Sequence, residues 1–182
     1  MVGEPVVIDI SKVEAARQGD KDCFAQVYES IAPDLYKVAL YTLGNAHDAE
    51  DVVSEVFIEA YKGIAGLRDQ DKFKFWMLKI LSIRCKRKIA EYVKGKNTFD
   101  IENFITTLSG EGEMDGEVAE KVTVIDALKR LSDQERQIVV LSVLQGYTTK
   151  EIAGILGSPH GTISSKLHRA LAKLRRMLET PA

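Results

Sequence analysis

Apolar residues recur with a helical period along most of the chain. In the first third, four of them have the spacing i, i+3, i+4 and i+7, which places side chains on one face of an α-helix. They are Phe24, Val27, Tyr28 and Ile31. Pro33 suits the first position of a following helix, where no N–H is needed, and Gly44 suits its end. The pattern therefore predicts one helix through Ile31 and a second from Pro33 to Leu43.

Two more helices are predicted in this half. Asp48 is a favourable N-cap for the first, and apolar residues behind it recur at inward-facing positions. These are Val52, Val53, Val56, Phe57 and Ala60. The segment GIAGLRDQD interrupts the period, and KFKFWMLKILSIRCKRKI resumes it, with four residues along one side. They are Trp76, Ile80, Ile83 and Arg87. Because no convincing alternating strand is present, residues 1–92 are predicted to form a small helical bundle.

Residues 93–120 have the composition of a linker. Glycines and polar residues dominate, and the ionised residues between Phe99 and Glu120 are all acidic. Such a segment has too little apolar surface to build a core. We expect a flexible acidic connector here.

Residues 121–182 return to the helical period. Ser132 with Glu135, and Thr148 with Glu151, have the S/T-x-x-E spacing of a capping box, which marks the first turn of a helix. The predicted fold class is therefore all-α, with two small helical domains joined by the acidic linker.

The stretch ILGSPHGTISSKLHR stops one helix and begins another within a few residues. Gly157 suits the left-handed position that closes a helix, Ser158 suits the next N-cap and Pro159 the first helical position. The second helix has apolar residues along one side, at Ile163, Leu167, Leu171, Leu174 and Leu178. Two short helices with basic residues outside the second predict a helix-turn-helix. The alternative is an ordinary helical hairpin with solvated charges, because capping signals occur in any protein.

Charge is segregated along the chain although the net charge is only −2. Residues 45–60 have only acidic ionised side chains, residues 72–97 are basic except for Glu91, and residues 158–178 are entirely basic. Two basic blocks separated by an acidic one predict two polyanion contacts. The blocks could also clasp each other in a compact, autoinhibited form.

Several classes of function are disfavoured by the sequence. No apolar run approaches the roughly 20 residues of a membrane span, and we expect no secretion signal, so a cytoplasmic protein is predicted. Cys23 and Cys85 lack metal or redox spacing and are expected to be reduced. No nucleophile–base arrangement or phosphate-binding glycine loop is present, so we expect no enzyme activity and no cofactor or metal.

Three segments together resemble the extracytoplasmic-function (ECF) sigma factors of bacterial RNA polymerase. GYTTKEIAGILGSPHGTISSKLHRALAKLRRML is similar to their C-terminal DNA-binding domain, HDAEDVVSEVFIEAY to the helix that docks on the polymerase clamp, and FKFWMLKILSIRCKRKI to the promoter-melting helix. The resemblance covers about residues 17–92 and 120–179. It implies promoter recognition, DNA melting and transcription initiation as a subunit of the polymerase.

The resemblance implies a contact with the minus-thirty-five element by the last helix. The base and phosphate contacts it implies are Pro159, His160, Thr162, Ser164, Ser165, Lys166, Arg169 and Lys173. Pro159 stands where the family usually has Ser or Thr, and Lys166 where it usually has Arg.

A second implied contact is with the minus-ten element. Single-strand binding needs cations for the backbone and aromatic or apolar surfaces for bases, and residues 68–88 supply both. The implied residues are Arg68, Lys72, Phe73, Lys74, Phe75, Trp76, Lys79, Ile83, Arg84, Lys86 and Arg87. Ile83 stands where the family often has Asn, and the loop GLRDQDK would hold a flipped base. The alternative is that the aromatic side chains belong to the core.

The third implied contact is with core RNA polymerase, through the clamp of its largest subunit. Its residues would be Asp48, Asp51, Val52, Glu55, Val56 and Glu59. A carboxylate metal site is disfavoured here because no Glu-x-x-His pair accompanies the stripe, whereas a solvated acidic face is an alternative. The acidic linker would thread the polymerase, and an anti-sigma factor would be a further partner. The rival functions are a stand-alone helix-turn-helix regulator and a non-initiating decoy that binds polymerase or an anti-sigma factor.

Overall fold

The structure, a computed structural model, describes residues 7–95 and 124–179. The described part is built from helices and contains no strand. In chain order the elements are α1 (Ile10–Arg17), α2 (Lys21–Leu43), α3 (Ala46–Gly63), the 3-10 turns η1 (Ile64–Gly66) and η2 (Gln70–Lys72), α4 (Phe73–Gly95), a helical segment at 124–129, α7 (Asp133–Val143), α8 (Thr149–Leu156) and α9 (His160–Glu179). The all-α prediction is confirmed, and the acidic linker lies largely outside the described residues.

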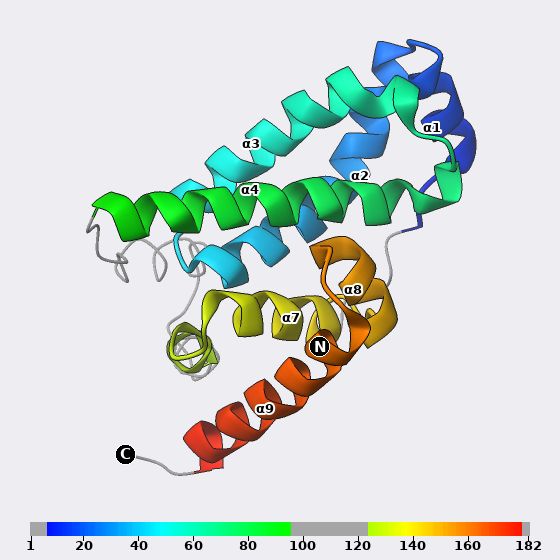
Figure 1. Ribbon diagram of the computed structural model, residues 1–182. Helices are drawn as coiled ribbons and strands as arrows, with labels where there is room; N and C mark the ends of the chain where they lie inside the picture. Colours follow the sequence, from blue (N-terminus) through cyan, green and yellow to red (C-terminus); the bar gives the residue numbers. More distant parts are fainter. Residues whose placement is uncertain (1–6, 96–123, 180–182) are drawn as a thin grey trace, which may run out of the picture.

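Helices α1 to α4 form the N-terminal bundle. In Figure 1, α3 and α4 lie side by side, and α2 packs against both. The largest side chains of this bundle that are fully buried come from α2 and α4. They are Phe24, Ile31, Leu35, Leu43, Phe73, Met77, Leu78 and Leu81. The helical period located the α2 part of this core. On α4 the predicted side is largely wrong, because Ile83 and Arg87 are exposed, whereas Met77, Leu78 and Leu81 are buried.

Helix α2 is continuous through Pro33, so the predicted break between two helices is wrong. Ile31 and Leu35 are both completely buried on either side of the proline, and Pro33 itself faces solvent. A proline inside a helix costs about 3 kcal/mol, whereas each buried large aliphatic side chain contributes about 1.5–3 kcal/mol. Burial on both sides of Pro33 therefore outweighs the local cost.

The first turn of α3 also differs from the prediction. Asn45, not Asp48, is the N-cap, because its side-chain oxygen accepts a hydrogen bond from the Asp48 backbone N–H at 3.0 Å. The preceding helix ends where expected, with Gly44 at φ 69°. Asp48 is thereby left with its carboxylate free to bond elsewhere.

Segment 124–129 and helices α7, α8 and α9 form the C-terminal bundle. Both predicted capping boxes are present, at Ser132–Glu135 and Thr148–Glu151. Gly157 closes α8 at φ 61°, in the left-handed conformation that a side chain would strain. The sharp turn that the sequence predicted between α8 and α9 is confirmed.

Helix α9 begins one residue later than predicted. The Pro159 carbonyl accepts the first helical hydrogen bond, from the Ile163 N–H at 3.1 Å, so Pro159 occupies the N-cap position. The Ser158 hydroxyl instead accepts a bond of 3.4 Å from the Gln134 side-chain amide. Ser158 therefore ties the turn to α7 and does not cap α9.

The buried side of α9 is narrower than the sequence indicated. Ile163 and Ala170 are buried and Leu167 and Leu174 are half-buried, whereas Leu171 and Leu178 are 42% and 49% exposed. The buried positions follow a 4-3-4 spacing, which gives a single stripe. The small bundle covers only that stripe, so the next apolar residues around the helix face solvent.

The two bundles pack against each other. Ile125, Ile138, Ile152 and Ile155 belong to the same buried cluster as the core of the N-terminal bundle. Arg136 donates to the Thr42 carbonyl at the end of α2 at 2.9 Å, and in Figure 1 α7 lies beside α2 and α4. The contact between the bundles is thus mainly apolar and differs from the contact between acidic and basic blocks that the charge pattern allowed.

Candidate nucleic-acid and partner interfaces

The start of α9 presents polar side chains to solvent. Pro159, His160, Ser164 and Ser165 are exposed, and Thr162 is half-buried. His160 Nε2 lies 2.8 Å from Thr149 Oγ1 at the start of α8, so the two helix starts are joined. Exposed hydroxyl and imidazole groups at the start of a helix can donate and accept hydrogen bonds at base edges in a major groove.

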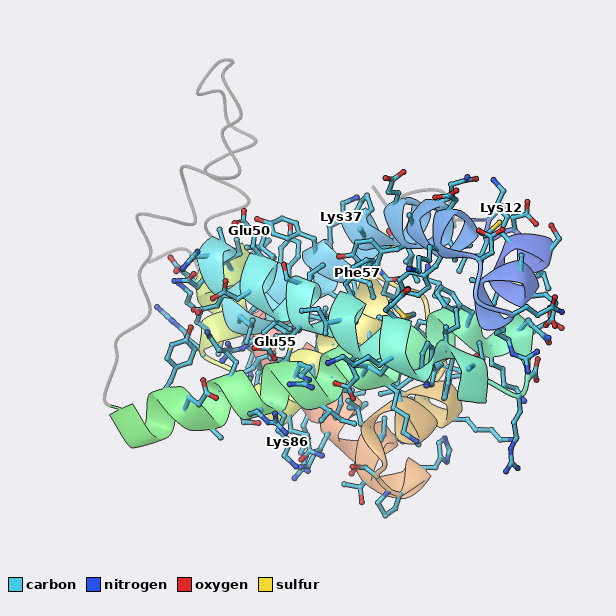
Figure 2. All side chains as sticks on the ribbon, turned by 90° about the horizontal axis from the view of Figure 1, so that it is seen from above. Lys12, Lys37, Glu50, Glu55, Phe57 and Lys86 are labelled. Atoms are coloured by element: carbon cyan, nitrogen blue, oxygen red, sulfur yellow. The ribbon has the colours of Figure 1, made fainter. Side chains whose placement is uncertain are left out.

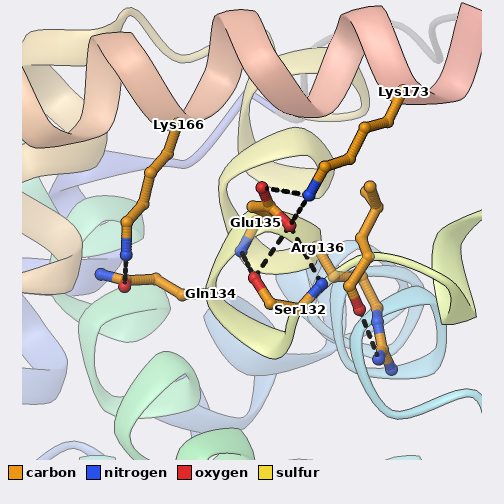
Figure 3. A network of polar contacts seen from close by, with 7 residues as sticks. Ser132, Gln134, Glu135, Arg136, Lys166 and Lys173 are labelled. Carbon is orange, nitrogen blue, oxygen red and sulfur yellow. Dashed lines mark hydrogen bonds and ion pairs between the residues drawn. The ribbon is translucent and has the colours of Figure 1, made fainter.

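Two of the three predicted phosphate contacts on α9 bind α7 instead (Figure 3). Lys173 Nζ lies 2.8 Å from Glu135 Oε1, and Lys166 Nζ donates to the Gln134 side-chain oxygen. The ion pair with Lys173, together with the Ser132 hydrogen bonds, lowers the pKa of Glu135 to about 2. Lys173 therefore differs from its predicted role, because it fastens α9 to α7. Of the three cations, Arg169 is the exposed one.

The aromatic residues at the start of α4 are more buried than a strand-binding surface requires. Phe73 is 1% exposed and belongs to the core, so its predicted base contact is wrong. Trp76 is half-buried against the end of α3, where a Cβ on Gly63 would lie 3.3 Å from its ring. Phe75 is half-buried against α8, where a Cβ on Gly154 would lie 2.9 Å from its ring. The alternative that these rings pack inward is correct for Phe73.

The exposed face of α4 is basic. Lys79, Lys86 and Arg87 surround Ile83, which is 52% exposed, and Arg68 and Lys72 are exposed on the loop before the helix. Lys86 lies on the side of α4 away from α3 (Figure 2). Lys74 instead forms an ion pair of 2.8 Å with Asp34 on α2, which withdraws it from solvent.

The acidic stripe of α3 is bound to the opposite side of α4. Arg84 Nη1 lies 3.0 Å from Glu55, and Arg84 Nε lies 2.7 Å from Glu59. Lys88 lies 3.0 Å from Asp48 and 3.6 Å from Asp51. These carboxylates raise the pKa of both cations, chiefly through Glu59 at Arg84 and Asp48 at Lys88.

Two residues of the predicted polymerase contact face the core. Val52 and Val56 are 1% and 0% exposed, so their predicted contact with a partner is wrong. They lie on the side of α3 that packs inward, as their helical spacing required. Sequence analysis missed Ile58 and Tyr61, which are 52% and 44% exposed on the outer part of α3. The helical period was the available signal for Ile58, because at about 100° per residue this position falls opposite the predicted inward face of α3.

The described residues contain neither a cluster of metal-ligating side chains nor a membrane-spanning helix. Among the residues that the structure describes, no group of three or more His, Cys, Asp or Glu side chains could hold a metal ion. None of the described helices combines the length and the apolar character that crossing a bilayer requires.

Comparison with known proteins assigns both bundles. Residues 27–93 match the family model for sigma-70 region 2, and residues 127–176 match that for sigma-70 region 4. The ECF sigma factor SigW of Bacillus subtilis is 28% identical over 179 residues, which cover 92% of this chain and 95% of SigW. The chain is an ECF sigma factor of the sigma-70 family. It therefore acts with core RNA polymerase in promoter recognition and transcription initiation.

A second relative agrees with this family, and two solved structures share the fold. The ECF sigma factor SigM of Mycobacterium tuberculosis (strain H37Rv) is 26% identical, with 93% of this ECF factor and 84% of SigM covered. CnrH, solved in complex with the cytosolic domain of CnrY, has a TM-score of 0.70 at 19% identity and covers 96% of this chain and 99% of its own. RpoE of Bartonella quintana, solved with NepR, has a TM-score of 0.67 at 20% identity. The match covers 87% of this chain and 98% of the RpoE chain. The region 4 match identifies α8 and α9 as the helix-turn-helix, against the alternative of an ordinary hairpin.

Proposed function

We propose that the exposed start of α9 reads the minus-thirty-five element. Pro159, His160, Ser164 and Ser165 would contact bases, with Thr162 at their edge, and Arg169 would contact phosphate. The exposure of these side chains and the bond between His160 and Thr149 support this assignment. Lys166 would reach phosphate only after leaving Gln134.

The minus-ten strand would lie along the outer face of α4. Lys79, Lys86 and Arg87 would hold its backbone, and the exposed Ile83 would contact an unstacked base. Arg68 and Lys72 would extend this surface onto the loop before α4. Trp76 would mark the edge of the melted region.

The polymerase clamp would bind the outer side of α3. Asp51, Glu55 and Glu59 would supply charge at their exposed oxygens, and Ile58 and Tyr61 would supply apolar area. A groove of about 450 Å³ between α3 and α4, lined by Glu55, Ile58 and Arg84 among others, supports this surface. Asp48 is half-buried against Lys88 and would contribute less.

The wider role is that of a dissociable, non-enzymatic subunit in the cytoplasm. Its domains would span residues 1–92 and 121–182, with residues 93–120 threading the polymerase. An anti-sigma factor would be a further partner, a proposal supported by the complexes of CnrH with CnrY and of RpoE with NepR.

The observation that carries this proposal is the presence of two separate exposed faces, a basic one on α4 and a polar one at the start of α9 that is followed by the exposed Arg169. It is tested by run-off transcription with core polymerase on a promoter library. We expect transcripts that depend on sequences near both minus-ten and minus-thirty-five. Dependence on one element alone would remove the assignment of the other face.

A further inference from the structure

Helix α1 lies outside the part of the chain that matches region 2, which begins at residue 27. It nevertheless packs against the loop of residues 64–72 that precedes α4. Val13 and Ala16 of α1 are buried in the same cluster as Ile64 and Leu67 of the loop. Helix α1 thus supports this loop, although α1 lies outside the residues that match region 2.

Glu14 makes the polar connection between α1 and the loop. Its carboxylate accepts a hydrogen bond from the Gln70 side-chain amide, 56 positions further along the chain. It also accepts bonds from Gln18 at 3.0 Å and from Arg17 at 2.6 Å. These donors lower the pKa of Glu14, with the Gln70 bond as the largest cause. Glu14 is therefore held as a carboxylate against the loop.

The loop is fixed at several other points. Ile64 and Leu67 are buried, and Asp69 accepts a bond from the Asp71 N–H at 3.1 Å and pairs with Lys72 at 3.0 Å. Ala65, Gly66 and Arg68 remain exposed between these anchors, and a Cβ on Gly66 would meet no heavy atom within 4 Å. Arg68 thus lies in the exposed part of a loop that is held in place by buried or hydrogen-bonded residues on both sides.

We propose that Glu14 is a positioning residue for promoter discrimination: through Gln70 it holds the loop in the conformation that presents Arg68 to a minus-ten base. The inference rests on the proposed function, in which this loop borders the melted strand. Arg68 has donors in a planar fork that suit a base edge, and an ordered loop loses less conformational entropy on binding than a free one. Glu14 itself does not touch DNA.

The test uses the full chain with core polymerase and promoters randomised in the minus-ten element. The measured quantity is a ratio of run-off transcript amounts. It compares promoters that carry the preferred minus-ten base with promoters that carry the second most preferred base at the same position. Glu14→Ala and Gln70→Ala should each reduce this ratio by roughly 10- to 100-fold, as expected for a lost hydrogen bond to a charged group. The double variant should lose no more than either single variant, because both remove the same contact.

Two controls separate positioning from general stability. Gln18→Ala removes another donor to Glu14 without touching the loop, and its ratio should stay unchanged. Glu14→Gln retains an oxygen that accepts from Gln70, so it should keep most of the discrimination while losing the charge paired with Arg17. Thermal unfolding of each variant is measured alongside.

The outcomes distinguish a failure of this inference from a failure of the proposed function on which it rests. If Gln70→Ala and Glu14→Ala lower transcription equally on all promoters while Arg68→Ala abolishes the base preference, the positioning role is overturned and the loop assignment stands. If Arg68→Ala also leaves the preference unchanged, the loop does not read the minus-ten element and the proposed function fails at this point. A collapse of stability in Glu14→Gln, with discrimination unaltered in folded Gln70→Ala, would assign Glu14 to folding alone.

Discussion

At the scale of single residues, two buried charged groups of α7 hold the molecule together. Arg136 is 3% exposed and donates to the carbonyls of Thr42 and Leu131 and to the Asp133 carboxylate. Glu135, its neighbour, is 8% exposed and joins the Ser132 cap to Lys173 (Figure 3). Buried charges are tolerated only when they are bonded, so removing either group leaves polar atoms without partners.

Arg136→Ala is expected to destabilise the protein by about 3 kcal/mol, because it leaves the buried Thr42 carbonyl without a donor and opens a cavity. Chemical denaturation of the full chain measures this loss. The matched control is Arg175→Ala, whose side chain is 77% exposed and which should change stability by less than about 0.5 kcal/mol. Equal effects of the two substitutions would contradict the bridging role of Arg136.

The Glu135–Lys173 pair predicts a pH dependence. The pKa of Glu135 is about 2 in the folded protein, below its usual 4.5, so the folded state binds the proton less readily than the unfolded state. The contribution of the ionised Glu135 carboxylate to the stability of the folded protein is therefore complete above pH 4.5 and is lost as the pH falls toward 2. Glu135→Gln keeps a capping box but loses the charge.

At pH 7 the free energy of unfolding of the wild type should exceed that of Glu135→Gln by about 2–3 kcal/mol. This difference should vanish as the pH falls from 4.5 to 2. Denaturant titrations across this range measure it. A difference that stays constant down to pH 2 would show that the charge of Glu135 contributes nothing.

At the scale of elements, α3 and α4 are joined by complementary charges. The carboxylates of Asp51 and Glu55 face Lys88 and Arg84, and Glu55 lies between the two helices (Figure 2). The same side chains are the proposed polymerase contact. A substitution there therefore acts on helix packing and on partner binding, and an experiment has to separate the two.

Asp51→Lys with Glu55→Lys should weaken association with core polymerase and also destabilise the bundle, because the new cations face Arg84 and Lys88. Adding Arg84→Gln and Lys88→Gln removes this repulsion and still offers amide donors to Glu59 and Asp48, the remaining acidic partners of these two positions. The fourfold variant should regain stability, to within about 1 kcal/mol, without regaining polymerase affinity. Recovery of both would mean that the acidic stripe serves only to pack α3 on α4.

At the scale of the whole molecule, the packing of the bundles covers part of the proposed DNA surface. Phe75 at the start of α4 lies under α8, the first helix of the helix-turn-helix. Contact between Phe75 and an unpaired strand therefore requires the C-terminal bundle to move away. Gly154 is the position where this contact is closest.

Gly154→Ala should loosen the packed arrangement, because the new Cβ would lie 2.9 Å from the Phe75 ring. Alanine also favours the α8 helix by about 0.5–1 kcal/mol, so the helix-turn-helix itself should remain folded. Small-angle scattering should show a larger radius of gyration at unchanged helicity. Gly161→Ala is the control, since nothing lies within 4 Å of its Cβ position.

Phe75→Ala combined with Gly154→Ala removes the clash and should return the scattering profile toward that of the wild type. An unchanged profile in Gly154→Ala alone would show that Phe75 can shift without opening the bundles.

The sequence by itself determined the features that depend on neighbouring positions. The helical period placed the core residues of α2 and α3, the Ser132 and Thr148 capping boxes marked two helix starts, and Gly157 marked the turn. These features follow from backbone geometry within a few residues. The same locality explains why the motifs for regions 2 and 4 could be recognised without coordinates.

Only the tertiary structure decided which polar side chains remain available. Lys74, Arg84 and Lys173 have the same local pattern as Lys79 and Arg169, yet the first three are bound to carboxylates on other helices. Pro33 stays within one helix because residues distant in sequence bury both of its flanks. Helical periodicity shows which face a residue occupies, whereas its partner on another element depends on how the helices pack.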